Sequence, residues 1–177
     1  MREDLLALIT QLRTKPYTDR AVLDQFEVRV NEGPPYTRDE GSAHHFCSFL
    51  LPVNMQERRV YLGHHIKGAS WMPPGGHIDR GERVITAVIR EFQEELQQTI
   101  TDRQVELFTA SIIQISRPGP CATHFDFWHL VHTDVIDFPY DPKEFHDAQW
   151  FRIEKAVTQV THPVYHPIME LLADKVF

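Results

Sequence analysis

The hydrophobic positions of this chain follow a helical period near the N-terminus. Between residues 5 and 12, and again between residues 18 and 30, apolar side chains recur every three or four positions, which predicts two amphipathic helices. Pro16 should end the first helix, and Gly33-Pro34-Pro35 should end the second. Residues 1–40 are therefore predicted to form a helical extension. It could cap a sheet, contribute to a homodimer or cover a substrate pocket, and packing is the commonest fate of such helices.

From Ala43 onward the pattern becomes one of strands. Short segments rich in β-branched and aromatic residues alternate with turn residues. The predicted strands cover residues 44–51, 59–65, 105–115, 124–131 and 148–151. Residues 52–58 are expected to be a polar connection, and a last helix is predicted at residues 163–176. Strands, a helix, strands and a helix in this order imply an α/β fold with a mixed sheet between helices.

A helix with an acidic face follows the glycine turn Pro73-Pro74-Gly75-Gly76. Its expected core-facing stripe consists of Ile85, Val88, Ile89, Phe92 and Leu96. Glu91, Glu94 and Glu95 share another patch, and like charges at these spacings destabilise a helix by about 0.2–0.5 kcal/mol per pair. The helix dipole also disfavours anions near the C-terminus. Because a hard divalent cation such as Mg²⁺ would reverse this penalty, the patch is interpreted as a metal site.

Composition narrows the class of protein. The 177 residues, 42% of them hydrophobic, suit one domain plus an extension. The formal net charge is −7 and no basic run occurs, so binding of long nucleic acid is not expected. Cys47 and Cys121 show no metal-type pairing and are expected to be free thiols. Without a signal-peptide layout or an uncharged apolar stretch of about 18 residues, a soluble cytoplasmic protein with no membrane contact is expected.

The 11 histidines show no spacing typical of a metal site. On a strand, His124 and Asp126 should share one face while His129 faces the other way. Neighbouring histidines, as in His44-His45 and His64-His65, should likewise point to opposite faces. A structural metal bound by histidines is therefore not expected.

The glycine turn and the acidic helix together resemble the signature of the Nudix hydrolases. That signature reads Gly, five residues, Glu, seven residues, Arg-Glu, two residues and Glu-Glu, closed by one residue, a Gly and an aliphatic residue. Six of its fixed positions match, at Gly76, Glu82, Arg90, Glu91, Glu94 and Glu95. Gln97 replaces the closing Gly, Gln98 replaces the aliphatic residue, and Phe92 stands where a smaller aliphatic residue is usual. Without that Gly, the helix could run a turn further.

The resemblance implies a Nudix-type α/β/α sandwich over residues 43–177, preceded by the helical extension of residues 1–40. It also implies Mg²⁺ as the cofactor, with Mn²⁺ as a substitute. The implied metal ligands are the backbone carbonyl of Gly75 and the side chains of Glu91, Glu94 and Glu95. Arg90 and Glu82 would orient these ligands.

The reaction implied is hydrolysis of a phosphoanhydride by metal-activated water. Glu94, or Glu144 in a later loop, would be the general base, and Gly76 and His77 would contact the substrate. The substrate would be a small nucleotide or other diphosphate, such as a nucleotide sugar, a dinucleotide or a nucleoside triphosphate. One alternative is a Nudix-like module that senses a nucleotide without cleaving it. Another, a prenyl diphosphate isomerase, would need a pocket cysteine, whereas Cys47 lies in an early strand.

Overall fold

The contacts between residues divide the chain into two units. The computed structural model describes residues 1–116 and 118–177. The first unit comprises residues 1–49, 76–88 and 107–129, and the second comprises residues 50–75, 89–106 and 130–177. Several helices and strands continue from one unit into the other, so each unit joins segments that are far apart in the sequence.

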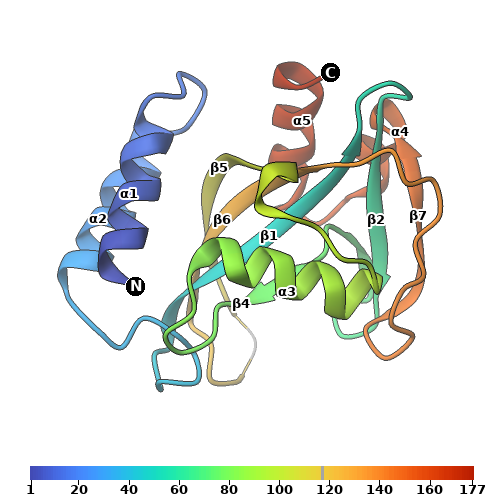
Figure 1. The fold of residues 1–177 in the computed structure, drawn as a ribbon. Coiled ribbons are helices and arrows are strands. Elements are labelled where there is room, and N and C mark those ends of the chain that lie inside the picture. The colour runs from blue at the N-terminus through green and yellow to red at the C-terminus, as the bar shows by residue number, and fades with distance from the viewer. Residues whose placement is uncertain (117) are drawn as a thin grey trace. The chain divides into compact units, whose positions relative to one another are not determined.

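In the first unit, helices α1 (Arg2–Arg13) and α2 (Arg20–Asn31) lie side by side (Figure 1, blue). Asp19 caps α2, since its carboxylate accepts a hydrogen bond of 2.8 Å from the Ala21 backbone N–H. Both helices bury their apolar faces in one cluster with aromatic residues from later in the chain. The cluster includes Leu5, Ile9, Leu12, Leu23, Phe26, Val30, Phe46, Phe125 and Phe127. The helical extension therefore has a packing role in this unit.

The strands of the first unit have the order β1-β6-β5. These are β1 (His44–Asn54), β5 (Val105–Gln114) and β6 (Thr123–His132), and the short β4 (Gly75–His77) pairs with β1. Helix α3 (Val84–Leu96) begins in this unit, where Asp4 of α1 caps it. The Asp4 carboxylate accepts hydrogen bonds from the Val84 backbone N–H, at 3.0 Å, and from Arg83 Nε, at 3.2 Å. A carboxylate at a helix N-terminus also interacts favourably with the helix dipole.

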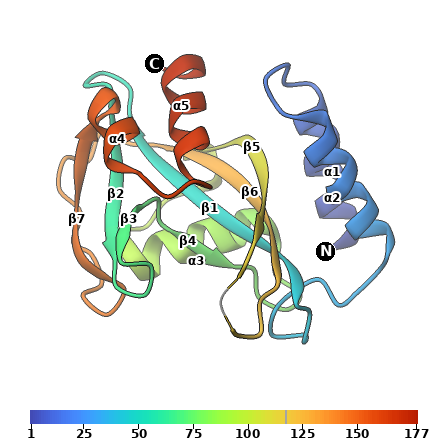
Figure 2. The same ribbon diagram turned by 180° about the vertical axis from the view of Figure 1, so that it is seen from behind.

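The second unit is built around β2 (Arg59–His65), as Figure 2 shows. Strand β7 (Phe145–Arg152) runs antiparallel to β2 from the Arg59–Arg152 pair to the His65–Phe145 pair, with an irregularity between His64 and His65. Strands β1 and β3 (Ser70–Met72) pair with opposite ends of β2. The unit also holds the 3₁₀ helix η1 (Asp102–Gln104), α4 (Ile153–Gln159) and α5 (His166–Lys175). None of the helices in the described ranges combines the length and apolar character needed to span a bilayer.

The mixed α/β fold predicted from the sequence is confirmed, although several boundaries differ. Strand β1 continues to Asn54, so the expected polar connection is shorter, because Pro52 and Val53 are buried within the strand. Helix α5 begins at His166 instead of residue 163. Strands β3 and β4 and helix α4 were not predicted, since three to seven residues are too few to establish a hydrophobic period.

His129 makes the first unit sensitive to acid. Its side chain is buried in β6, and burial lowers the pKa of the imidazole from 6.5 to about 4, although the backbone groups of Phe49 and Phe127 oppose this shift. The imidazole of His129 is therefore protonated near pH 6.5 in the unfolded chain, but only near pH 4 in the folded protein. The contribution of His129 to the free energy of unfolding is fully present above pH 6.5. It decreases by about 3 kcal/mol as the pH falls toward 4.

We expect His129→Gln to remove the part of the acid-induced decrease in the free energy of unfolding that comes from this histidine. Urea denaturation at pH 6.5 and pH 4 should show a decrease in unfolding free energy that is about 3 kcal/mol smaller for the variant than for the wild type. His132→Gln, at a more exposed position of the same strand, should keep the wild-type decrease. Equal decreases in all three proteins would contradict the assignment to His129.

Candidate active site

The glycine turn is joined to α3 by one hydrogen bond. Gly75 has a φ of 132° and donates its N–H to Glu95 Oε2 at 2.8 Å. The preceding Pro74 carbonyl accepts a hydrogen bond of 3.0 Å from the Leu50 N–H of β1, which fixes the turn against the sheet. All four residues belong to the second unit. The Glu95 carboxylate therefore lies beside the backbone of the turn, where a side chain at Gly75 would be strained by the positive φ.

Glu91 and Glu95 lie one turn apart on α3, and both are buried, with 8% and 6% exposure. Burial first and the Glu91 carboxylate second raise the pKa of Glu95 well above its usual range. The hydrogen bond from Gly75 lowers that pKa, and the charges of Glu144 and Glu94 raise it further. Two adjacent buried carboxylates destabilise a protein unless a cation balances them. Oxygen ligands of this kind fit a hard divalent cation.

Arg90 neutralises part of this charge. Its Nη1 donates hydrogen bonds to Glu91 Oε1, at 2.9 Å, and to Glu94 Oε2, at 3.1 Å. The Glu94 side chain is 59% exposed, so it extends toward solvent and Arg90 instead of joining the buried pair. The two groups of metal-type ligand atoms found within 4.8 Å in the described ranges do not include the helix glutamates. Arg90 thus hydrogen-bonds to two of the predicted ligands.

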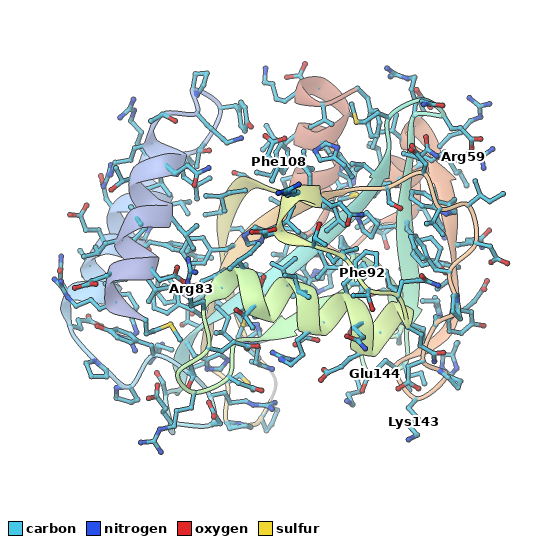
Figure 3. The ribbon with its side chains drawn as sticks, in the orientation of Figure 1. Arg59, Arg83, Phe92, Phe108, Lys143 and Glu144 are labelled. Carbon is cyan, nitrogen blue, oxygen red and sulfur yellow. The ribbon has the colours of Figure 1, made fainter. Side chains whose placement is uncertain are left out.

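Glu144 lies in the loop before β7, in the same unit as Glu95 (Figure 3). The loop is joined to α3 because the Asp141 N–H donates to the Glu95 carbonyl at 2.9 Å. The Glu144 carboxylate lies 3.4 Å from Lys67 Nζ and 3.6 Å from His65 Nε2, and its side chain is 34% exposed. The charge of Glu144 raises the pKa of Glu95, and the Glu144 carboxylate is partly open to solvent.

The other predicted site residues lie in the first unit. Glu82 closes the turn before α3: its carboxylate accepts a hydrogen bond of 3.0 Å from the Asp79 N–H, and its own N–H donates to the Asp79 carbonyl. Gly76 and His77 follow Gly75 in β4. His77 faces other histidines, with ring centroids 4.9 Å from His45 and 5.2 Å from His124.

Gln97, which replaces the closing glycine of the signature, adopts the backbone conformation that glycine favours. Its φ is 51°, and α3 ends at Leu96. The absence of the glycine suggested that the helix could run a turn further, but α3 ends at Leu96. The burial pattern of α3 also differs from the expected stripe, because Ile85 and Ile89 are only partly buried while Val84 and Ala87 are fully buried.

The sequence did not reveal a group of four side chains in the first unit. They are His45, His77, Cys121 and His124, and their ligand atoms all lie within 4.8 Å of one another. A second group, which shares His124, adds Cys47 and Asp126. Because the members come from separate strands and a loop, no local spacing in the sequence could have indicated them.

Comparison with known proteins identifies the fold. The E. coli dihydroneopterin triphosphate pyrophosphohydrolase is 15% identical and superposes with a TM-score of 0.63, over 74% of this chain and 96% of that one. The MutT protein from Methanosarcina mazei is 17% identical, with a TM-score of 0.60 over 73% and 93%. A C. elegans Ap4A hydrolase is 18% identical, with a TM-score of 0.54 over 73% and 95%. A search of curated protein sequences gives no significant match.

A family model described as the NUDIX domain matches residues 43–172, which is most of the chain. The match begins where the predicted helical extension ends, and the division into an extension of residues 1–40 and a domain of residues 43–177 stays a prediction. Members of this family generally use divalent metals and act on small nucleotides, and the solved structures above share the fold. The chain therefore belongs to the Nudix family and is a hydrolase of pyrophosphate bonds.

Proposed function

We propose that this Nudix hydrolase is a Mg²⁺-dependent pyrophosphohydrolase of small molecules that contain a nucleoside diphosphate. The proposal depends mainly on Glu91 and Glu95, two adjacent buried carboxylates, with Glu95 hydrogen-bonded to Gly75 in the glycine turn. The solved structures with this fold include enzymes named for dihydroneopterin triphosphate and for Ap4A. These names support a triphosphate or a dinucleotide as the substrate class, and a nucleotide sugar is the third candidate, from the family resemblance alone. Cys47 and Cys121 form no disulfide in the part of the chain that the structure describes, which is consistent with the proposed cytoplasmic location.

Each site residue has a proposed role. Glu91, Glu95 and the Gly75 carbonyl would hold Mg²⁺, with Glu94 as a further ligand, and Mn²⁺ would substitute. When bound, the ion supplies charge neutralisation for the diphosphate and acidifies water. Arg90 fixes the carboxylate of Glu91, to which it donates a hydrogen bond at 2.9 Å.

The turn and one general base would complete the machinery. Glu82 closes the turn that leads into α3, and Gly76 offers backbone that a phosphate can approach closely. A carboxylate then takes the proton of the attacking water as the bond between phosphorus and the bridging oxygen breaks. Glu144 is the preferred base, because its loop is hydrogen-bonded to α3 at Glu95 and because Glu94 is already proposed as a metal ligand.

A substrate panel tests the proposal. Nucleotide sugars, dinucleotides and nucleoside triphosphates would each be incubated with Mg²⁺, with Mn²⁺ and with EDTA, and the products separated by chromatography. We expect a nucleoside monophosphate from at least one class with Mg²⁺, none with EDTA, and full recovery when Mg²⁺ alone is added back. Turnover that persists in EDTA would refute the metal mechanism. Tight binding across the panel without cleavage would instead support a nucleotide sensor.

A further inference from the structure

Three histidines and one cysteine meet in the first unit, and of these four only His77 was among the site residues expected from the sequence. The histidine–cysteine cluster consists of His45 in β1, His77 in β4, Cys121 in the loop before β6, and His124 in β6. The ligand atoms of all four lie within 4.8 Å of one another, and Cys121 Sγ is 3.8 Å from His77 Nε2. Neutral imidazole nitrogens and a thiolate are the ligands that Zn²⁺ prefers in proteins.

The position and the tautomer of the His45 ring suit a metal ligand. It is fully buried, and its Nδ1 lies 2.7 Å from the Ser42 carbonyl oxygen. A carbonyl can only accept, so Nδ1 carries the proton and Nε2 carries the lone pair. This Nε2 makes no hydrogen bond with any residue that the structure describes. A buried acceptor without a partner destabilises the folded protein, whereas a metal ion would satisfy it.

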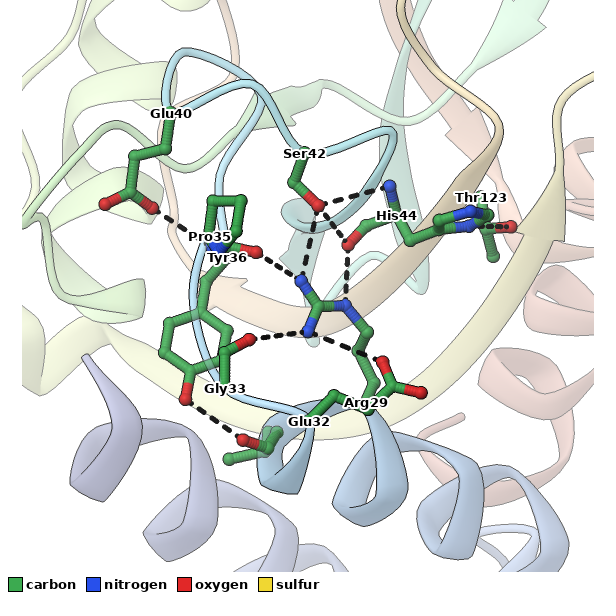
Figure 4. Close-up of polar contacts among 10 residues, drawn as sticks. Arg29, Glu32, Gly33, Pro35, Tyr36, Glu40, Ser42, His44 and Thr123 are labelled. Atoms are coloured by element: carbon green, nitrogen blue, oxygen red, sulfur yellow. Dashed lines mark hydrogen bonds and ion pairs between the residues drawn. The ribbon is translucent and has the colours of Figure 1, made fainter.

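A buried arginine holds the segment that orients His45 (Figure 4). Arg29, which is 7% exposed, donates from Nη2 to Ser42 Oγ at 3.3 Å and from Nε to the His44 carbonyl at 2.8 Å. On the next strand, Thr123 Oγ1 lies 3.0 Å from His44 Nδ1, which joins the residues beside His45 and His124. Such outer contacts are typical of metal sites, where they fix the direction of each ligand.

The cluster is close to the size that zinc requires. Zn–N bonds of about 2.0–2.1 Å and Zn–S bonds of about 2.3 Å place tetrahedral ligand atoms about 3.3–3.7 Å apart. The Cys121–His77 separation of 3.8 Å already approaches this, and the remaining pairs would need to close by about 1.5 Å at most. The ring centroid of His45 lies 4.9 Å from that of His77 and 4.8 Å from that of His124, so the three rings are already in contact.

We propose that the histidine–cysteine cluster binds one Zn²⁺ with tetrahedral geometry. Four protein ligands leave no open position, so the ion would be structural and would take no part in hydrolysis. Cys121 would bind as its thiolate and release its proton to solvent. The two metal sites would select different ions, because oxygen ligands suit Mg²⁺ whereas imidazole and thiolate suit Zn²⁺. This assignment gives His77 a ligand role in place of the substrate contact expected from the sequence.

The site would join three strands and one loop of the first unit. His77 follows directly after Gly76, so the ion would also restrain the end of the glycine turn. Metal binding to preformed ligands stabilises the folded state, because the unfolded chain lacks the arrangement. The free energy of unfolding should therefore rise when Zn²⁺ is added, even in the presence of saturating Mg²⁺.

Cobalt substitution tests the proposal with the untagged full-length protein. Co²⁺ would be added to metal-free protein in excess Mg²⁺, which occupies the oxygen ligands. We expect intense tetrahedral d–d bands together with a near-ultraviolet thiolate-to-cobalt charge-transfer band, both removed by one equivalent of Zn²⁺. Absence of the charge-transfer band in the wild-type protein would overturn the proposal.

Two cysteine variants form a matched pair for the same measurement. Cys121→Ser should abolish the charge-transfer band and weaken Zn²⁺ binding by more than about 100-fold, since even outer partners of a metal contribute about 10–100-fold. Cys47→Ser should retain both the band and the affinity, and circular dichroism would confirm that each variant is folded. Loss of the band in Cys47→Ser but not in Cys121→Ser would place the ion at the group formed by Cys47, His124 and Asp126, and would overturn the proposal.

Discussion

Replacing Glu95 with glutamine is expected to reduce kcat by about 10³-fold or more, because the variant removes a proposed metal ligand. Removing a residue that only orients a metal ligand typically reduces activity by about 10–100-fold, so a larger effect is expected here. Glutamine keeps an oxygen that can accept the hydrogen bond from Gly75, so the turn should stay in place. Burial and the Glu91 charge disfavour the ionised form of Glu95 in the metal-free protein. The same variant should therefore raise the melting temperature measured in EDTA at neutral pH.

Steady-state kinetics and thermal melts of the metal-free protein would check both expectations for Glu95→Gln. Gln93→Ala provides a control, because Gln93 is an exposed residue of the same helix that has no proposed role. It should retain activity. Wild-type turnover in Glu95→Gln would remove this residue from the mechanism, and a lower melting temperature would show that its charge is compensated in the folded state.

Glu144→Gln is expected to reduce kcat by about 10²–10⁴-fold with little change in KM, which is the usual contribution of a general base. The amide cannot accept the proton of water, yet it can still lie beside Lys67 and His65. Loss of a base should also flatten the acidic limb of the kcat–pH profile, which a purely structural role would leave unchanged.

Lys143→Gln is the matched control for Glu144→Gln. Lys143 precedes Glu144 in the loop, and its backbone N–H donates to Asp141 Oδ1 at 2.9 Å, so the variant changes a charge without removing the hydrogen bond that shapes the loop. It should keep at least about a tenth of the wild-type kcat, below the contribution of a base. A similarly small loss in Glu144→Gln would return the role of base to Glu94.

The sequence predicted the helix, the glycine turn and the family, because these depend on local spacing. It could not predict that Glu91 and Glu95 are buried while Glu94 is exposed. Helical spacing fixes the direction of each Cα–Cβ bond, whereas the exposed position of Glu94 depends on its rotamer and on Arg90. The approach of the Glu144 loop to α3 depends on a contact between residues distant in the chain, Asp141 and Glu95.

The histidine–cysteine cluster shows the same limit more clearly. Strand alternation predicts that His44 and His45 point to opposite faces, and in the structure His44 is exposed whereas His45 is buried. The alternation does not say which strands are adjacent. It therefore could not predict that the rings of His45 and His124 lie 4.8 Å apart. Pairing of β1 with β6 and of β4 with β1 brings these rings together.

Gln97 has a consequence for recognising distant members of the family. The signature asks for glycine at this position, yet the chain turns out of the helix there with a φ of 51° and a glutamine side chain. Its amide lies 3.4 Å from the Tyr140 carbonyl, a contact that glycine could not make. The chain therefore keeps the torsion angle of this position without the glycine, and a search that scores a compatible dihedral would accept this sequence where a strict letter pattern rejects it.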